Sequence, residues 1–115
     1  MFSFENLEVY QKAILFANDI YNLTKTFPKD ELFGLTGQLR RASVSVSLNI
    51  AEGSGRTKKD FKHFLTMART SIHECIPLLN LSSLQNYISK DTERKFYHQC
   101  EELTKMLCGL IKSLE

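Results

Sequence analysis

The sequence predicts an all-α protein with the architecture of an antiparallel up-down four-helix bundle. Apolar residues recur at spacings of three and four along four separate segments, which is the period of an amphipathic helix. Short stretches with Gly, Pro or polar residues separate these segments, so consecutive helices are expected to run antiparallel. The 115 residues suffice for one hydrophobic core, and we expect residues 1–115 to form a single four-helix-bundle domain.

The composition is that of an ordinary globular protein, with 43% hydrophobic and 24% charged residues. The sequence has no run of about 18 apolar residues, and its N-terminus lacks a basic stretch followed by an apolar core. Neither a membrane span nor a secretory signal is therefore expected. The three cysteines are odd in number and lie in helix-like segments, which favours reduced thiols over a disulfide framework. We expect a cytoplasmic protein with no membrane partner.

The first predicted helix runs from about Asn6 to Phe27. Asn6 is expected to cap its N-terminus, and Pro28 ends it because the residue before a proline is disfavoured in helical conformation. One stripe at helical spacing comprises Leu7, Tyr10, Ile14, Ala17, Tyr21 and Thr24. Further apolar residues widen this stripe and indicate extra burial, namely Ala13, Phe16, Ile20 and Phe27.

The second segment has a polar start and a glycine-rich end. It begins near Asp30, Glu31 or Leu35 and stops at the helix-breaking cluster Gly53-Ser54-Gly55. Within it, residues 38–56 (QLRRASVSVSLNIAEGSGR) alternate apolar and polar side chains, which by itself is typical of a β-strand. A strand needs partner strands, and no other segment offers one. We therefore favour a helix.

As a helix, this segment carries apolar residues on two opposite faces. At 100° per residue, one stripe lies within about 60° of Leu35 and comprises Leu39, Ala42, Val46, Ile50 and Gly53. Val44, Leu48 and Ala51 point to the opposite side. Because a corner helix of a small bundle normally keeps one face in water, we expect these three residues to form a homo-oligomer interface. The alternative is a helix buried more deeply than its neighbours within one chain.

The third predicted helix opens with Thr57 as N-cap, with Asp60 three residues further on. Its apolar stripe comprises Phe61, Phe64, Leu65, Ala68, Ile72, Cys75, Ile76 and Leu79. Pro77 lies inside this pattern and is expected to kink the helix or to end its regular part early. A polar stretch at residues 82–86 then leads towards the last helix.

The fourth predicted helix starts near Ser89 or Asp91. Its spacing, close to that of a bundle seam, is carried by Phe96, Cys100, Leu103, Leu107, Leu110 and Leu114. Gly109 lies inside this helix at some cost in helix propensity. We expect another helix to approach closely at this glycine.

No residue pattern points to catalysis or to a metal centre. A di-metal site in a bundle needs Glu-x-x-His on two helices, and that motif is absent. His73, Glu74 and Cys75 are adjacent on one helix, so their side chains point in different directions. Cys75, Cys100 and Cys108 are expected to face the core as small hydrophobes. We predict no catalytic residue, no metal site and no cofactor.

Basic residues cluster from the middle of the second segment to the middle of the third. They are Arg40, Arg41, Arg56, Lys58, Lys59, Lys62 and Arg69. An oligomer would repeat them around its axis and so strengthen a field that attracts nucleic-acid phosphates. The alternative is a solvated face paired with Glu52, Asp60 and Glu74. The net charge of only +2 gives no whole-molecule case for nucleic-acid binding.

A distinctive motif covers the same region. It comprises Phe27-Pro28, Glu31, Phe33-Gly34-Leu35, Gln38-Leu39-Arg40-Arg41-Ala42, Ser45, Asn49-Ile50-Ala51-Glu52-Gly53, Arg56 and Phe61. In this order, these residues resemble the four-helix-bundle proteins encoded in intervening sequences of bacterial 23S ribosomal RNA genes. The similarity extends from Phe4 to the last helix.

This resemblance implies an all-helical bundle, and the residues themselves offer no catalytic constellation, so we predict a protein that is not an enzyme. The family is similar in fold to the accessory variability determinant of diversity-generating retroelements, a pentameric barrel that binds nucleic acid and a reverse transcriptase. The resemblance therefore implies a homopentamer whose partner is structured RNA or a nucleic-acid enzyme such as a reverse transcriptase. A protein–protein adaptor without a nucleic-acid role is the alternative.

The resemblance also implies structural roles for Asn49, Glu52 and Gly53. A buried Asn49 and Glu52 are expected to bond the following turn or to pair with Arg41 or Arg56, and so to order the interface.

Overall fold

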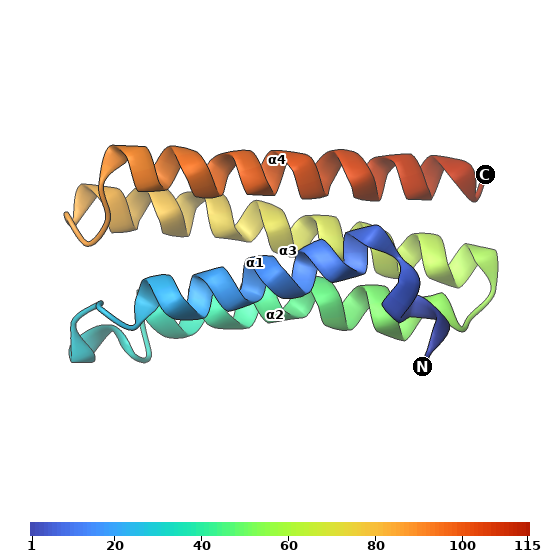
Figure 1. The fold of residues 1–115 in the computed structure, drawn as a ribbon, viewed down its shortest axis with the longest axis horizontal. Coiled ribbons are helices and arrows are strands. Elements are labelled where there is room, and N and C mark those ends of the chain that lie inside the picture. The colour runs from blue at the N-terminus through green and yellow to red at the C-terminus, as the bar shows by residue number, and fades with distance from the viewer.

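The computed structural model covers residues 1–115 and consists of four long helices joined by short turns (Figure 1). The elements in chain order are η1 (Ser3–Asn6), α1 (Glu8–Thr24), η2 (Lys29–Glu31), α2 (Leu35–Ser54), α3 (Lys58–Leu84) and α4 (Lys90–Ser113). Residues 38–56 lie in α2 and in the turn that follows it, so the strand-like alternation there does not form a strand. The predicted all-α four-helix bundle is confirmed.

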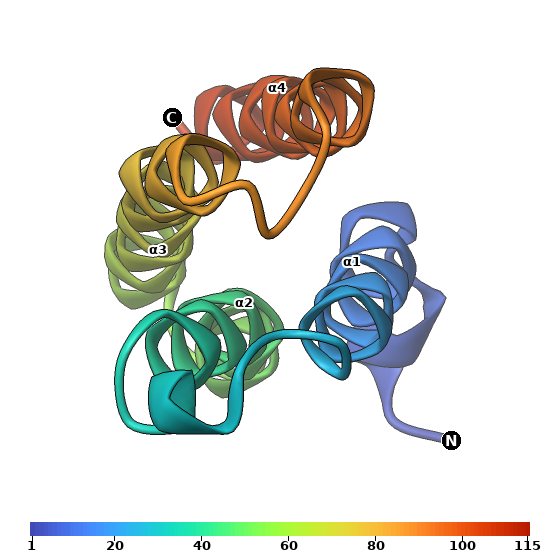
Figure 2. The same cartoon turned by 90° about the vertical axis from the view of Figure 1, so that its left-hand side faces the viewer.

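The helices run alternately up and down along a molecule of 43 × 22 × 20 Å (Figure 1). One end of the bundle, here called the α2–α3 end, carries the α2–α3 turn and both chain termini. The opposite end, here called the α1–α2 end, carries the α1–α2 and α3–α4 turns. In the end view, the four helices follow one another around a common centre (Figure 2). Each therefore packs mainly on its neighbours in the chain, and α1 and α4 share the thinnest interface.

The core is a single cluster to which all four helices contribute. Its large, fully buried side chains include Phe16, Ile20, Leu39, Ile50, Leu65, Ile72, Leu79, Leu103 and Leu107. The predicted core stripe of α2 is confirmed, because Leu39, Ala42, Val46, Ile50 and Gly53 are all buried. Burial of this stripe against α1 and α3 supplies most of the drive to fold this segment as a helix. None of the four helices combines the length and apolar character required to cross a membrane.

Of the two predicted N-terminal caps, Thr57 is confirmed and Asn6 is not. Thr57 Oγ1 accepts the backbone N–H of Asp60 at 3.2 Å, and Ser89 caps α4 in the same way through the N–H of Thr92. The prediction of Asn6 as the cap of α1 is wrong. Asn6 belongs to the 3₁₀ turn η1, and Leu7 occupies the cap position without a side-chain hydrogen bond.

Two further expectations, an early end of α3 at Pro77 and a close helix approach at Gly109, are wrong. Pro77 does not end α3, which continues to Leu84. The proline ring lies on an exposed part of the helix surface, so it is accommodated there and the helix continues past the lost hydrogen bond. Gly109 is exposed, and a Cβ placed on it would meet no atom within 4 Å, so no helix of the same chain approaches closely there.

The end of α3 is set by Asn86, which adopts the left-handed conformation with a φ of 63°. Its backbone N–H donates to Ser83 O, and the N–H of Tyr87 donates to Ser82 O, each at 2.9 Å. This pair of hydrogen bonds is a Schellman motif, which satisfies the last carbonyls of a helix. The polar residues Ser82 and Ser83 are thus buried at the end of α3 rather than forming a linker.

Candidate functional site

The outer face of α2 carries the residues predicted as an oligomer interface. Val44, Leu48 and Ala51 point away from the buried stripe, as helix geometry requires. Leu48 is 62% exposed, whereas Val44 and Ala51 are half-buried beside it. The structure thus presents an apolar face on a helix that already has a complete core face. The subunit contact itself stays a prediction.

Asn49 connects α2 to α3 through a chain of side-chain hydrogen bonds. Its amide donates to Ser45 O at 2.8 Å and to Ser45 Oγ at 3.1 Å. Ser71 Oγ of α3 donates to Ser45 Oγ at 2.9 Å and is also 3.1 Å from Met67 O. Asn49 is half-buried and bonds backwards within α2, so the expectation that it is buried and bonds the following turn is wrong.

Gly53 allows α2 and α3 to pack closely. A Cβ at this position would lie 2.7 Å from Phe64 Cβ, closer than real Cβ atoms come to their neighbours, and 3.0 Å from Phe61 Cδ1. The expected structural role of Gly53 therefore has a steric basis.

Glu52 is exposed, not buried as expected, but it does pair with Arg56. Arg56 also donates from Nε to Glu52 O at 3.1 Å, and its guanidinium carbon lies 5.0 Å from the centroid of the Phe64 ring. These contacts hold Arg56 over the α2–α3 turn. The guanidinium stacks on an aromatic face while its charge is balanced by a carboxylate, which is a structural use of arginine.

The remaining basic residues near this turn are free of acidic partners. Lys58, Lys59 and Lys62 lie in the first turns of α3, at the α2–α3 end, and none of them forms a salt bridge. Arg69 lies further along α3, where its Nη1 is 3.4 Å from Cys108 Sγ of α4. Of the alternative pairing with Glu52, Asp60 and Glu74, only the pair of Arg56 with Glu52 occurs.

Arg40 lies on a different side of the molecule. Its Nε donates to Thr24 Oγ1 of α1 at 2.9 Å, and its guanidinium carbon lies 4.7 Å from the centroid of the Tyr21 ring. Arg40 precedes Arg56 by 16 positions, which is about 24 Å along a helix. The structure therefore separates Arg40, near the α1–α2 end, from the lysines at the α2–α3 end. Arg41 is exposed and makes no side-chain hydrogen bond.

Glu31 has a role that the sequence analysis missed. Its Oε1 accepts the backbone N–H of Leu35 at 3.1 Å, and its Oε2 accepts the hydroxyl of Tyr87 at 3.0 Å. Glu31 thus caps α2 and ties it to the α3–α4 turn, where Tyr87 also contacts Phe27. The hydrogen bond to this carboxylate, with some burial, raises the pKa of Tyr87. The sequence signal for this role was the position of the acidic Glu31 four residues before Leu35, the first residue of α2.

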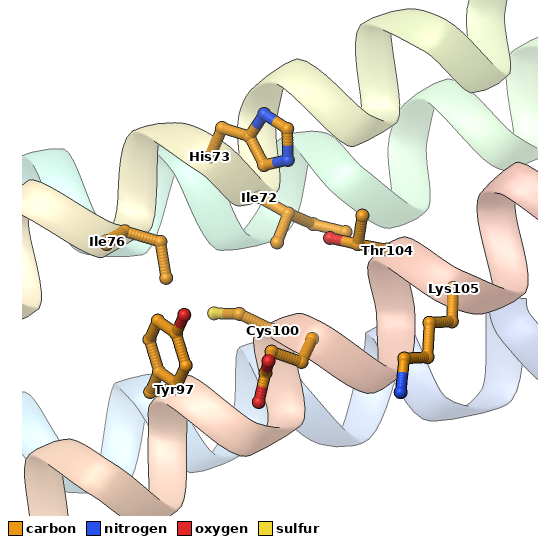
Figure 3. Close-up of a pocket in the computed structure, with 8 residues that line it drawn as sticks. Ile72, His73, Ile76, Tyr97, Cys100, Thr104 and Lys105 are labelled. Carbon is orange, nitrogen blue, oxygen red and sulfur yellow. The ribbon is translucent and has the colours of Figure 1, made fainter.

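A groove between α3 and α4 gathers the residues that most resemble a catalytic set (Figure 3). It has a volume of about 250 Å³ and is lined by His73, Tyr97 and Cys100, among others. No hydrogen bond joins these three side chains, which point from separate turns into or along the groove (Figure 3). Burial raises the pKa of the Cys100 thiol to about 12, so it stays protonated and unreactive at neutral pH. The Cys100 thiol is therefore not an activated nucleophile.

The cysteines divide into two kinds. Cys75 and Cys100 are buried and free, as predicted, and burial also raises the pKa of Cys75 to about 12. Cys108 is exposed, so the expectation that it faces the core is wrong. It lies one position after the buried Leu107, and a shift of one residue turns a helical side chain by about 100°. No three His, Cys, Asp or Glu side chains come together in a way that could hold a metal ion.

Fold and surface together define a small, all-α, up-down bundle protein with an exposed apolar helix face and two separate basic regions. The sequence model of the family described as 23S rRNA-intervening sequence protein matches residues 5–109. The chain belongs to this family, which confirms the resemblance drawn from the motif in α2.

Solved structures include similar chains. One of them is the crystal structure of a protein with unknown function from the S23 ribosomal protein family of Bacteroides thetaiotaomicron. The two chains are 27% identical, with a TM-score of 0.82, and the match covers 90% of this chain and 98% of the other. A search among curated proteins finds no match.

Proposed function

We propose that this chain is a non-enzymatic scaffold that assembles into a homo-oligomer and binds structured RNA. Assembly uses the outer face of α2, with Leu48 at its centre, and the resemblance to pentameric relatives favours five subunits. RNA binding uses the free lysines at the α2–α3 end, Lys58, Lys59 and Lys62, with Arg41, Arg56 and Arg69 at its margins.

The observation that carries this proposal is the group of unpaired lysines at one end of the bundle. A single chain with a net charge of +2 attracts RNA weakly. An oligomer that repeats three free ammonium groups around its axis presents a multivalent surface, and each phosphate contact adds to the affinity by releasing counterions. Arg40 is no longer part of this surface, because it is directed towards α1 at the other end.

The assembly is tested by light scattering together with circular dichroism. The wild-type chain is expected to form particles of several subunits, and Leu48→Lys to form monomers of unchanged helicity, because a charge placed on an apolar interface cannot be paired there. Leu15→Lys is the matched control, since Leu15 is 61% exposed on α1 and should not affect assembly. A monomeric wild-type protein contradicts the proposal.

RNA binding is tested by fluorescence anisotropy with a structured RNA at several salt concentrations. Affinity should fall steeply with salt and be lost in the double variant Lys58→Glu with Lys62→Glu. The double variant Lys90→Glu with Lys95→Glu changes the charge equally on α4 near the opposite end, and should retain binding. Binding that is absent at low ionic strength, or equal in the two variants, contradicts the RNA proposal.

A second candidate function is a protein–protein adaptor with no nucleic-acid role. It is favoured by the low net charge and by large exposed apolar residues at the α1–α2 end, of which Phe33 is 94% exposed and Leu84 is 69% exposed. A defined partner retained after nuclease treatment, and lost on Phe33→Ser, would support this function over RNA binding.

A further inference from the structure

A cavity of about 340 Å³ lies at the α1–α2 end, where the end of α1, the turn after it and the start of α2 meet. This volume is within the range of about 300–1,000 Å³ that is typical of small-molecule sites. Phe27 and Leu32 contribute its apolar walls. Three cations also line it, namely Lys25, Lys29 and Arg40.

No acidic side chain lines this cavity or pairs with its cations. The salt bridges of the molecule involve none of Lys25, Lys29 and Arg40. Of the two nearby acidic residues in sequence, Glu31 is bonded to Leu35 N and to the Tyr87 hydroxyl, and Asp30 is exposed. Three uncompensated positive charges therefore surround one concave space, where walls of low dielectric strengthen their field.

Arg40 is pre-oriented for a ligand in this cavity. Its Nε is fixed by Thr24 Oγ1 and its guanidinium plane is supported by Tyr21, whereas its two terminal nitrogens make no hydrogen bond. A fixed guanidinium with free terminal N–H groups matches the geometry of an oxyanion. Little side-chain entropy is left to lose when such a group binds.

Thr36 supplies an uncharged polar group to the same cavity. It is only 4% exposed and lines the cavity, yet its hydroxyl makes no hydrogen bond within the protein. No fully buried side-chain oxygen or nitrogen in the molecule lacks a partner. The hydroxyl of Thr36, a residue that lines the cavity, therefore reaches solvent and has its donor hydrogen free for a ligand.

We propose that this cavity binds the terminal phosphate monoester of a ligand. The phosphate accepts hydrogen bonds from Arg40, Lys25, Lys29 and the hydroxyl of Thr36. Phe27 and Leu32 pack against the ligand's apolar portion. A phosphate monoester carries between about 1.5 and 2 negative charges at neutral pH and three acceptor oxygens, which suits three cations and a hydroxyl better than a single carboxylate does. The site is separate from the lysines at the α2–α3 end and does not depend on the RNA-binding proposal.

The test is isothermal titration calorimetry of the wild-type chain, at low ionic strength, with adenosine 5′-monophosphate, inorganic phosphate and adenosine. The monophosphate and inorganic phosphate should bind saturably, and adenosine should not. Arg40→Gln should weaken monophosphate binding about tenfold, because it removes a charged hydrogen-bond donor. Lys29→Gln should weaken it about threefold, because Lys29 is exposed to solvent.

Arg41→Gln is the matched control, since it removes an equal charge from the neighbouring position without touching the cavity. It should leave monophosphate binding unchanged, as should Lys58→Glu with Lys62→Glu. Circular dichroism checks that Arg40→Gln remains folded, and Lys29→Gln tests the site without disturbing any contact of the fold. Absence of monophosphate binding at millimolar concentration, or binding that is unchanged in both Arg40→Gln and Lys29→Gln, overturns the proposal.

Short RNAs with and without a 5′-phosphate distinguish the two sources of such a group. A 5′-phosphorylated RNA that binds more tightly than the monophosphate, with sensitivity to Arg40→Gln, assigns the site to a chain end. A monophosphate that binds at least as tightly assigns it to a small molecule. Equal affinity for the two RNAs, together with no monophosphate binding, contradicts both assignments of the site.

Discussion

Gly53 and Gly109 are both helical glycines, but their surroundings are opposite. Gly53 faces Phe61 and Phe64 at a distance that excludes a methyl group, whereas Gly109 faces solvent. The first glycine is required by packing, and the second only reduces the helix propensity of α4.

Alanine substitutions should therefore change stability in opposite directions. We expect Gly53→Ala to lower the free energy of unfolding by about 1–3 kcal/mol, because Phe64 must move to admit the Cβ. Gly109→Ala should raise it by about 0.5–1 kcal/mol. Urea denaturation measures both, and a neutral Gly53→Ala would show that α2 and α3 separate at little cost.

The buried thiols make stability depend on alkaline pH. Cys75 and Cys100 have a pKa of about 12 in the folded chain, raised from an ordinary 9.0 mainly by burial. Between these values the unfolded chain releases thiol protons that the folded chain retains. The free energy of unfolding is thus unaffected below about pH 9 and should fall above it by about 1.4 kcal/mol per pH unit for each thiol.

Cys75→Ala should remove half of this thiol-dependent slope, and Cys108→Ala should leave it unchanged because Cys108 is exposed. Urea denaturation at several pH values between 8 and 11 measures the slopes. Equal slopes in the wild type and in Cys75→Ala would contradict the burial of this thiol.

At the scale of elements, α2 and α3 form the most extensive interface of the molecule. Small residues let the two helices approach, and the hydrogen bond from Ser71 Oγ to Ser45 Oγ crosses between them. This contact places a polar side chain in a mostly apolar interface, so its partner is needed.

We expect Ser71→Ala to destabilise the chain by about 0.5–1.5 kcal/mol through loss of this hydrogen bond. Thr70→Ala is the matched control, since Thr70 is exposed and bonds only to Thr66 O of its own helix. A double-mutant cycle with Ser45→Ala should give a non-zero coupling energy in denaturant unfolding. Additive effects would show that the bond contributes nothing to helix pairing.

Local sequence signals predicted most of these elements. The apolar period located all four helices, and Thr57 and Ser89 marked two of their starts, because capping depends on neighbouring backbone. The ends that were missed depend on tertiary packing. Helix α3 continues past Pro77 because it packs against its neighbouring helices. It ends at the left-handed turn of Asn86, which the presence of an Asn in a polar stretch is not enough to predict.

The candidate site could be predicted only in part for the same reason. The apolar outer face of α2 follows from helix geometry alone, so the position of Leu48 on this face could be predicted. The division of the basic residues between the two ends of the bundle does not follow from helix geometry, because the direction of Arg40 depends on which helix packs beside α2. Thr24 and Tyr21 of α1, which hold this guanidinium, lie 16 and 19 positions away in sequence.

At the scale of the whole molecule, the interfaces between neighbouring helices differ in extent. The thin α1–α4 interface is bridged by polar contacts, Lys12 to Glu102 at 3.0 Å and Gln99 to Asp19 at 2.9 Å. The first of these bridges is exposed and the second only part-buried, and such contacts stabilise little, so α1 should separate from α4 more readily than α2 from α3.

Native-state hydrogen exchange should show this difference. We expect core amides of α1, such as that of Phe16, to exchange through an opening of lower free energy than those of Val46 in α2 and Ile72 in α3. Lys12→Ala should lower the α1 value further and leave the α2 value nearly unchanged. Equal protection in all four helices would show that the bundle opens only as a whole.

The common position of the two chain termini has a practical consequence for handling the protein. Both chain termini lie at the α2–α3 end (Figure 1). Phe2 and Phe4 border a hollow that Arg56 also lines. Attachment to a sensor surface through either terminus would therefore turn the lysines of α3 towards the support. The cavity beside Arg40 would face the flowing solution. Immobilised protein should thus capture small phosphates freely while showing weakened capture of RNA, and a label placed at Asn86 would reverse that orientation.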